Sequence, residues 1–206
     1  GKPAGMWALF AGSFEKHLTV EFDLTAGQAK DVAARAKKKY REIIAKLPEF
    51  DKRDRFEMNI VNCAMLAAFI LCMPQRPDIK TLTDYYAAAM MTPTMKAFCR
   101  ASGKKKFTPK DIEGMKATAK LRAGDRNPYS WNMDFFEYED GSGYEARFTT
   151  CGICTLMQVL GLYDLTPALC HLDYTMSDAG GASDFVREYT LASGGPYCDC
   201  GYHKKQ

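Results

Sequence analysis

The hydrophobic pattern of this chain changes its period near Pro128, and that change constrains the fold more than any other feature. Before it, apolar residues recur at helical spacing, and after it, runs of aromatic and β-branched residues are separated by glycine-containing turns. A segment patterned for a helix does not serve as a strand, so the two halves must contribute different elements. We therefore expect an α+β fold of one compact domain, in which a helical region, residues 1–127, packs on a cysteine-rich region, residues 128–206.

Capping residues and proline positions predict four helices in the first half. The second of them is apolar nearly all round, which predicts that it is the central buried helix. Pro93 interrupts or ends the third, and Thr108-Pro109 followed by an acidic residue begins the fourth. The expected helices run from Thr25 to about Leu47, from Asp54 to Met73, from Asp78 to about Met91, and onward from Thr108.

The second half predicts a sheet backed by short helices. A β-hairpin is expected over residues 131–139 and 144–150, since the turn sequence Asp140-Gly141-Ser142-Gly143 lies between two aromatic runs. Two short helices, 151–160 and 166–177, and two further strands, 184–192 and 197–203, follow. The order of two strands, two helices and two strands predicts a four-stranded antiparallel sheet covered by helices.

Composition and charge exclude several classes of protein. Hydrophobic residues make up 47% of the chain and charged residues 26%, values that exclude wholesale disorder. The longest strongly apolar stretch, residues 64–73, is about half of a membrane span, and no charged leader precedes an apolar core, so a cytoplasmic protein without membrane contact is expected. The lysine runs 37–39 and 104–106 lack interleaved aromatics and predict solvated surface rather than a nucleic-acid site.

Cys170 is the first candidate for a reactive thiol. Thr166 and Pro167 predict a helix that begins just before it, and the positive end of a helix dipole favours the thiolate. Asp173 lies three residues further on and shares its face, where an ionised carboxylate would raise the pKa of the thiol. The pair makes chemical sense if Asp173 carries a proton or binds a substrate. A buried cysteine beside a surface aspartate is the structural alternative.

Two further positions suit the binding of an anion. Cys151 stands where a strand passes into a helix, next to the free N–H groups of the first turn. Arg187 is one of two arginines in the acidic half and suits a substrate carboxylate, although a cross-strand ion pair would explain it equally well. Strand alternation directs Cys198 and Cys200 to one face of a strand and Asp199 to the other.

A metal site is a weaker interpretation of the cysteines. Four sulfurs could hold zinc or an iron–sulfur cluster, and Cys-x-x-Cys is also a redox spacing. The second pair is Cys-x-Cys, however, and the loops lack glycine-flanked zinc knuckles, so no metal or other cofactor is expected. The four candidate ligands are Cys151, Cys154, Cys198 and Cys200.

Residues 130–203 resemble the L-2-amino-thiazoline-4-carboxylic acid hydrolase family, and two stretches carry the likeness. The first is Cys151-Gly-Ile-Cys-Thr-Leu-Met, followed by Gly161-Leu162 and Leu165-x-Pro167-x-Leu169-Cys170-x-x-Asp173. The second is Arg187-x-x-Thr190-Leu191-Ala192-x-Gly194-Gly195-x-x-Cys198-Asp199. The family pattern continues with an aromatic residue where this chain has Cys200.

The resemblance implies a bacterial-type, cofactor-free hydrolase. It would open a cyclic amidine, a thiazoline carboxylic acid derived from cysteine, at a non-peptide C–N or C–S bond, and its partner would be a small molecule with a carboxylate. We assign Cys170 as nucleophile, Asp173 as proton carrier or partner of the amidinium, and Cys198 as a third catalytic residue. Substrate binding is assigned to Cys151, Arg187, Thr190 and Asp199.

Other interpretations stay open at this stage. Water could attack with Asp173 as base while the cysteines only shape the pocket. A non-catalytic module that binds or senses a small molecule is a second possibility, and a cysteine-ligated metal or redox protein is a third.

Overall fold

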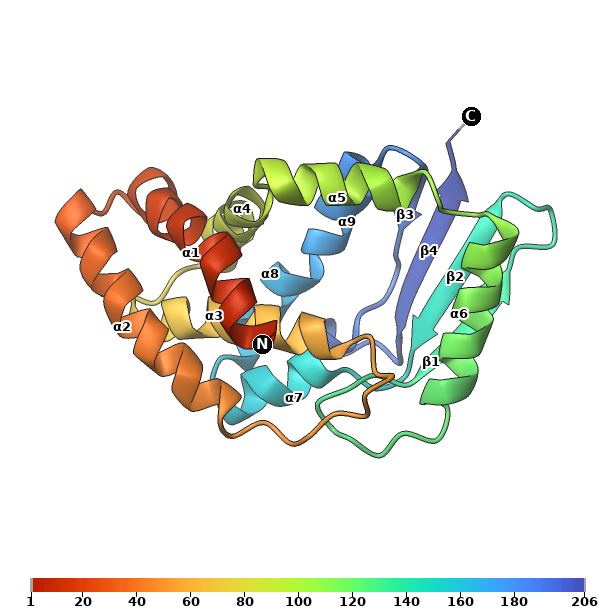
Figure 1. Cartoon of the computed structure of the whole chain (residues 1–206), viewed down its shortest axis with the longest axis horizontal. Coiled ribbons are helices and arrows are strands. Elements are labelled where there is room, and N and C mark those ends of the chain that lie inside the picture. Colours follow the sequence, from red (N-terminus) through yellow and green to blue (C-terminus); the bar gives the residue numbers. More distant parts are fainter. Residues whose placement is uncertain (1, 206) are drawn as a thin grey trace.

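The computed structural model describes residues 2–205, which form an α+β fold as expected. Helices make up the first part of the chain and surround α3, as Figure 1 shows. Their bounds are α1 Lys2–Glu21, α2 Ala26–Ile44, α3 Glu57–Cys72, α4 Ile79–Met90, α5 Pro93–Gly103 and α6 Pro109–Arg122. No helix in this described part of the chain is long and apolar enough to cross a membrane.

Strands and short helices make up the second part. The strands are β1 Met133–Glu137, β2 Gly143–Phe148, β3 Ser183–Val186 and β4 Cys198–Lys204. The helices between them are α7 Gly152–Val159, α8 Thr166–Cys170 and α9 Leu172–Gly180, with single 3₁₀ turns at Tyr163–Leu165 and Leu191–Ser193.

The capping residues behave as the sequence predicts. Thr25, Asp78 and Thr108 each cap a helix by accepting a hydrogen bond from a backbone N–H of its first turn. Helix α3 is buried on nearly all sides, because its apolar residues leave no polar face to turn toward water.

Several predicted boundaries are wrong. Asp54 does not begin α3, which starts at Glu57, because the Asp54 carboxylate is used in a buried ion pair instead. The segment expected to be one helix over 166–177 is broken at His171 into α8 and α9. The strand expected over 184–192 ends at Val186, where the chain leaves the sheet.

Two helices have no counterpart among the predicted elements. Helix α1 buries Met6, Phe10, Phe14 and Leu18, a spacing of four that is itself a helical signal. Pro93, expected only to interrupt the preceding helix, also occupies the first turn of α5, where Thr92 provides the cap.

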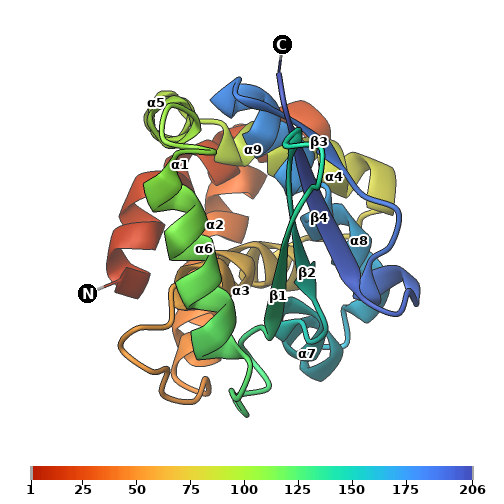
Figure 2. The same ribbon diagram turned by 90° about the vertical axis from the view of Figure 1, so that its right-hand side faces the viewer.

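The four strands form one antiparallel sheet in the order β1-β2-β4-β3. Helices α6 and α9 cover one face of the sheet, its inner face, where α6 packs beside β1 and α9 beside β3 (Figures 1 and 2). The inner face is apolar and includes Met133, Ala146, Phe185, Cys198 and Cys200. Gly143 allows β2 and β4 to approach, since a Cβ there would lie 1.9 Å from the Tyr202 carbonyl oxygen.

One of the two lysine runs is not entirely solvated surface. The Lys106 ammonium lies 3.4 Å from the ring centroid of Tyr202, with the rings of Phe107 and Tyr144 nearby. Burial among these rings lowers the pKa of Lys106 to about 8.

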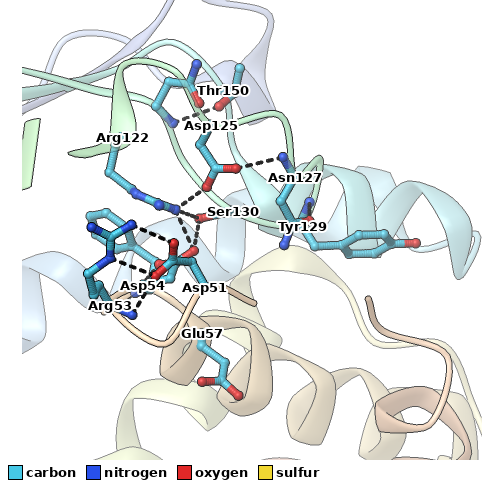
Figure 3. Close-up of polar contacts among 12 residues, drawn as sticks. Asp51, Arg53, Asp54, Glu57, Arg122, Asp125, Asn127, Tyr129, Ser130 and Thr150 are labelled. Carbon is cyan, nitrogen blue, oxygen red and sulfur yellow. Dashed lines mark hydrogen bonds and ion pairs between the residues drawn. The ribbon is translucent and has the colours of Figure 1, made fainter. Parts of the chain in front are cut away.

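A buried ion pair joins the helical half of the chain to the strands (Figure 3). The Arg122 guanidinium donates to Asp54 at 2.6 Å and to the Ser130 hydroxyl at 3.0 Å, and Ser130 itself donates to Asp54 at 2.5 Å. Arg122 also pairs with Asp125. The side chains of Arg122 and Asp54 are 3% and 1% exposed, so each charge depends on the other for its neutralisation.

Replacement of Arg122 by Met is expected to lower the free energy of unfolding by about 3–5 kcal/mol, because it leaves the Asp54 carboxylate buried without its partner. Chemical denaturation measures this change. Arg126→Met, which removes an exposed arginine from the loop that follows α6, is the control and should change the free energy of unfolding by less than about 0.5 kcal/mol. Equal effects of the two substitutions would contradict the importance of the buried pair.

Candidate active site

Cys151 occupies the N-cap position of α7, and the local backbone stabilises its thiolate. The backbone N–H groups of Ile153 and Cys154, the Trp131 side chain and the Cys154 thiol lie near the sulfur and favour its charged form. These contacts, the Cys154 thiol first among them, outweigh the effect of burial and lower the pKa of Cys151 to about 7. About half of this thiol is therefore ionised at neutral pH.

Gly152 permits this arrangement. A Cβ at this position would lie 2.2 Å from the Tyr129 carbonyl oxygen and 3.0 Å from Ile60 Cδ1. Only glycine lets the start of α7 approach the Tyr129 backbone so closely. The loop before β1 and the first turn of α7 are consequently in direct contact.

The loop that carries Trp131 is held by side-chain contacts along its length (Figure 3). Asp125 accepts from the Asn127 N–H at 2.9 Å, and Asn127 accepts from the Tyr129 N–H at 3.0 Å. Ser130, next to Trp131, belongs to the buried Arg122 cluster. Trp131 is itself 6% exposed and packs on the ring of Phe56 at 5.5 Å. The indole N–H that reaches Cys151 therefore comes from an immobilised side chain.

Cys170 has a different electrostatic environment from the one that the sequence predicts. The expectation that a helix dipole lowers its pKa is wrong, because Cys170 is the last residue of the five-residue helix α8. Burial raises the pKa of Cys170 strongly, and the charges of Cys151 and Asp173 raise it further, while Arg187 opposes them. Cys170 is consequently a neutral thiol at pH 7.

Arg187 and Asp173 form an ion pair beside Cys170. The guanidinium also donates to the Cys170 carbonyl oxygen at 3.2 Å and lies over the rings of Phe185 and Tyr174. Its side chain is 4% exposed, whereas that of Asp173 is 45% exposed. Desolvation by the surrounding protein raises the pKa of Asp173, and the charge of Arg187 opposes that rise.

One donor of Arg187 is unused. Its Nε is buried and has no hydrogen-bond partner within residues 2–205. A buried donor without a partner is energetically costly, so a ligand oxygen that reached it would be favoured.

A surface pocket of about 200 Å³ opens at this position. Cys170 and Arg187 line it together with the polar side chains of Thr190, Ser193 and Glu188. The complete lining is Pro167, Cys170, His171, Tyr174, Arg187, Glu188, Thr190 and Ser193.

The structure brings five of the predicted site residues into one cluster. Cys151, Asp173, Arg187 and Cys198 all lie close enough to Cys170 for their charges to affect its pKa. Cys198 accepts a hydrogen bond from the Leu191 N–H at 3.2 Å, and burial raises its pKa.

Thr190 and Asp199 are engaged in local contacts. Thr190 lines the pocket, but its hydroxyl also caps the 3₁₀ turn by accepting from the Ser193 N–H at 3.1 Å. Asp199 lies on the opposite face of β4 from Cys198 and Cys200, as strand alternation predicts. Its carboxylate accepts from the N–H groups of Glu188 and Tyr189 at 2.9 and 2.6 Å, which holds the chain that follows β3.

The possible metal ligands do not form a binding group. Among residues 2–205, no three His, Cys, Asp or Glu side chains are arranged to hold a metal ion. Cys198 and Cys200 pack within the apolar inner face of the sheet, whereas Cys151 and Cys154 contact each other at the start of α7.

Sequence reasoning did not find two residues that contact the cysteines of α7. The sequence predicts only a strand at Trp131 and only a turn at Tyr163. The Tyr163 side chain lies near Cys154, and its hydroxyl donates to the Leu191 carbonyl at 3.1 Å. No local pattern marks either contact, because both partners are brought together by the fold.

The fold and the cluster define a class of protein: an α+β protein in which a cysteine at a helix start and an arginine–carboxylate ion pair both belong to the cluster around Cys170. Residues 58–202 match the family model of L-2-amino-thiazoline-4-carboxylic acid hydrolase, which is more than half of the chain. The chain therefore belongs to this family. No curated protein and no solved structure matches it.

Replacement of Trp131 by Phe is expected to raise the pKa of Cys151 by up to about one unit, because the ring is kept but the N–H donor to the thiolate is lost. The pH dependence of Cys151 alkylation by iodoacetamide, followed by mass spectrometry, measures the shift. Trp7→Phe, in the helical body, is the control and should leave the profile unchanged. An unchanged profile for Trp131→Phe would exclude the indole as a stabilising donor.

Proposed function

We propose that this protein hydrolyses a cyclic amidine, an aminothiazoline carboxylic acid derived from cysteine, with Cys151 as the nucleophile. The family supports the substrate class. The single observation that carries the assignment of the nucleophile is the position of Cys151 at the N-cap of α7, in the cluster around Cys170 that also contains Arg187 and Asp173. Cys170, the nucleophile expected from the sequence, is less suitable because its thiol is neutral at pH 7.

The first step is attack on the ring. The Cys151 thiolate adds to the ring carbon that is bonded to sulfur and to two nitrogens. The bond from this carbon to the ring sulfur then breaks, and the electron pair leaves with that sulfur as a thiolate. Backbone N–H groups at the start of α7 stabilise the attacking sulfur before addition and after release, so the same groups serve both steps.

The second step is hydrolysis of the covalent intermediate. Water adds to the same carbon and gives one proton to Asp173. The bond to the Cys151 sulfur then breaks to regenerate the thiolate, the carbonyl forms, and the second proton of the water passes to solvent. Asp173 then passes its proton to the sulfur released from the ring. The product is a carbamoyl-cysteine, and one water molecule is consumed per turnover.

The Arg187–Asp173 pair orients the substrate. Asp173 is the more exposed partner and binds the protonated amidine, a planar cation that matches a carboxylate. The unpartnered Nε–H of Arg187 donates a hydrogen bond to the substrate carboxylate. Thr190, Ser193 and the neutral thiol of Cys170 line the pocket, and Cys198 belongs to the cluster around Cys170.

Replacement of Cys151 by Ser is expected to lower kcat by ~10³-fold or more, because a hydroxyl is not ionised at neutral pH. Cys170→Ser is the matched control and should keep activity within about tenfold. Turnover of the aminothiazoline carboxylic acid, with the carbamoyl product quantified, is the measurement. If Cys170→Ser abolishes turnover and Cys151→Ser does not, the nucleophile is Cys170. Binding of the compound without turnover in the unaltered protein would support a sensing module instead.

The pH dependence of kcat/KM should show a rising limb with a midpoint near 7. Below this pH Cys151 is protonated, and activity should fall tenfold per pH unit, because only the thiolate attacks. Trp131→Phe should move the limb to higher pH. A limb centred near 8.5, the value of an ordinary thiol, would contradict the activation of Cys151.

A further inference from the structure

Cys151 and Cys154 are placed as a pair of interacting thiols. Cys151 is the N-cap and Cys154 the third residue of α7, positions whose side chains are neighbours in a helix start. The first turn is closed by the Thr155 N–H, which donates to the Cys151 carbonyl at 3.3 Å. The N-cap and N3 side chains meet over the first turn of a helix, and each of the two thiols affects the pKa of the other.

The two thiols of this pair are partly exposed to solvent, and the pKa of the Cys151 thiol is lowered. Cys151, Cys154 and Cys170 are partly exposed, whereas the remaining cysteines are buried. Cys151 and Cys154 both lie in the first turn of α7, at its positive end, whereas Cys170 ends α8. A partly exposed thiolate beside a second thiol is the arrangement that reacts with peroxides and then forms a disulfide.

We propose that Cys151 and Cys154 form a site of reversible oxidation by hydrogen peroxide, and that the resulting disulfide switches hydrolysis off. The oxidation itself follows from the geometry of the two thiols. The effect on hydrolysis rests on the proposed function, in which Cys151 must be a free thiolate.

The chemistry balances in two steps. The Cys151 thiolate attacks one peroxide oxygen, the O–O bond breaks, and hydroxide leaves while the sulfur becomes a sulfenic acid. The Cys154 sulfur then attacks the Cys151 sulfur, an S–S bond forms, and the hydroxyl departs as water with the proton of the Cys154 thiol. Two thiols lose two electrons in total, and one hydrogen peroxide is reduced to two water molecules.

The test is to treat the full-length protein with an equimolar amount of hydrogen peroxide and to measure its intact mass. The unaltered protein should lose the mass of two hydrogen atoms and regain it with dithiothreitol. Cys154→Ser should instead gain oxygen on Cys151, because the second thiol is missing. Cys170→Ser is the matched control and should still lose two hydrogen atoms. Cys151→Ser should react at least ~10-fold more slowly than the unaltered protein.

Two results would overturn the proposal. Oxygen addition without hydrogen loss in the unaltered protein would exclude the disulfide, and loss of the disulfide in Cys170→Ser would identify a different partner. Turnover is measured in parallel, and oxidised protein should be inactive until it is reduced. The mass change does not depend on turnover. If the reduced protein has no hydrolase activity, that result contradicts the proposed function but does not affect the evidence for the disulfide. Activity that persists in the fully disulfide-bonded protein would overturn the switch.

Discussion

The buried contact among Arg122, Asp54 and Ser130 connects segments that are far apart in the chain, and the position of the site depends on it. Asp54 precedes α3, Arg122 ends α6, and Ser130 precedes β1. Each of these polar groups is buried, so none can leave the cluster without a large desolvation cost to the others. The loop that carries Trp131 is thereby fixed against the start of α7, where Gly152 permits close contact. A cluster remote from the substrate pocket thus determines the surroundings of Cys151.

The cysteines of the site differ in protonation although their side chains are identical. Cys151 receives hydrogen-bond donors from the first turn of α7 and from Trp131, and these favour its charged form. Burial raises the pKa of Cys170, Cys198 and Cys200, and the negative groups around them disfavour a second charge, although Cys198 accepts one hydrogen bond from the Leu191 N–H. One thiolate in the cluster therefore suppresses ionisation of the others. The proposed mechanism uses this separation, with one sulfur as nucleophile and neutral thiols beside it.

Much of the fold was predictable because its signals are local. The capping residues Thr25, Asp78 and Thr108 predicted the starts of their helices. The turn residues 140–143 between two aromatic runs predicted the hairpin. The break between α8 and α9 and the short β3 were not predictable, since neither has a local signal as strong as a proline or glycine cap at that point. Within the candidate site, the residue types and their convergence around Cys170 were foreseen, whereas the contribution of Trp131 was not.

The sequence by itself determined the α+β class, the antiparallel sheet and the family, because hydrophobic period, turn residues and spaced motifs are properties of the linear chain. It also predicted cysteines, Asp173 and Arg187 as the site residues of the second half. Only the tertiary structure decided which cysteine is ionised and that Arg187 pairs with Asp173. A pKa depends on desolvation and on donors from distant segments, and those distances exist only after the chain has folded.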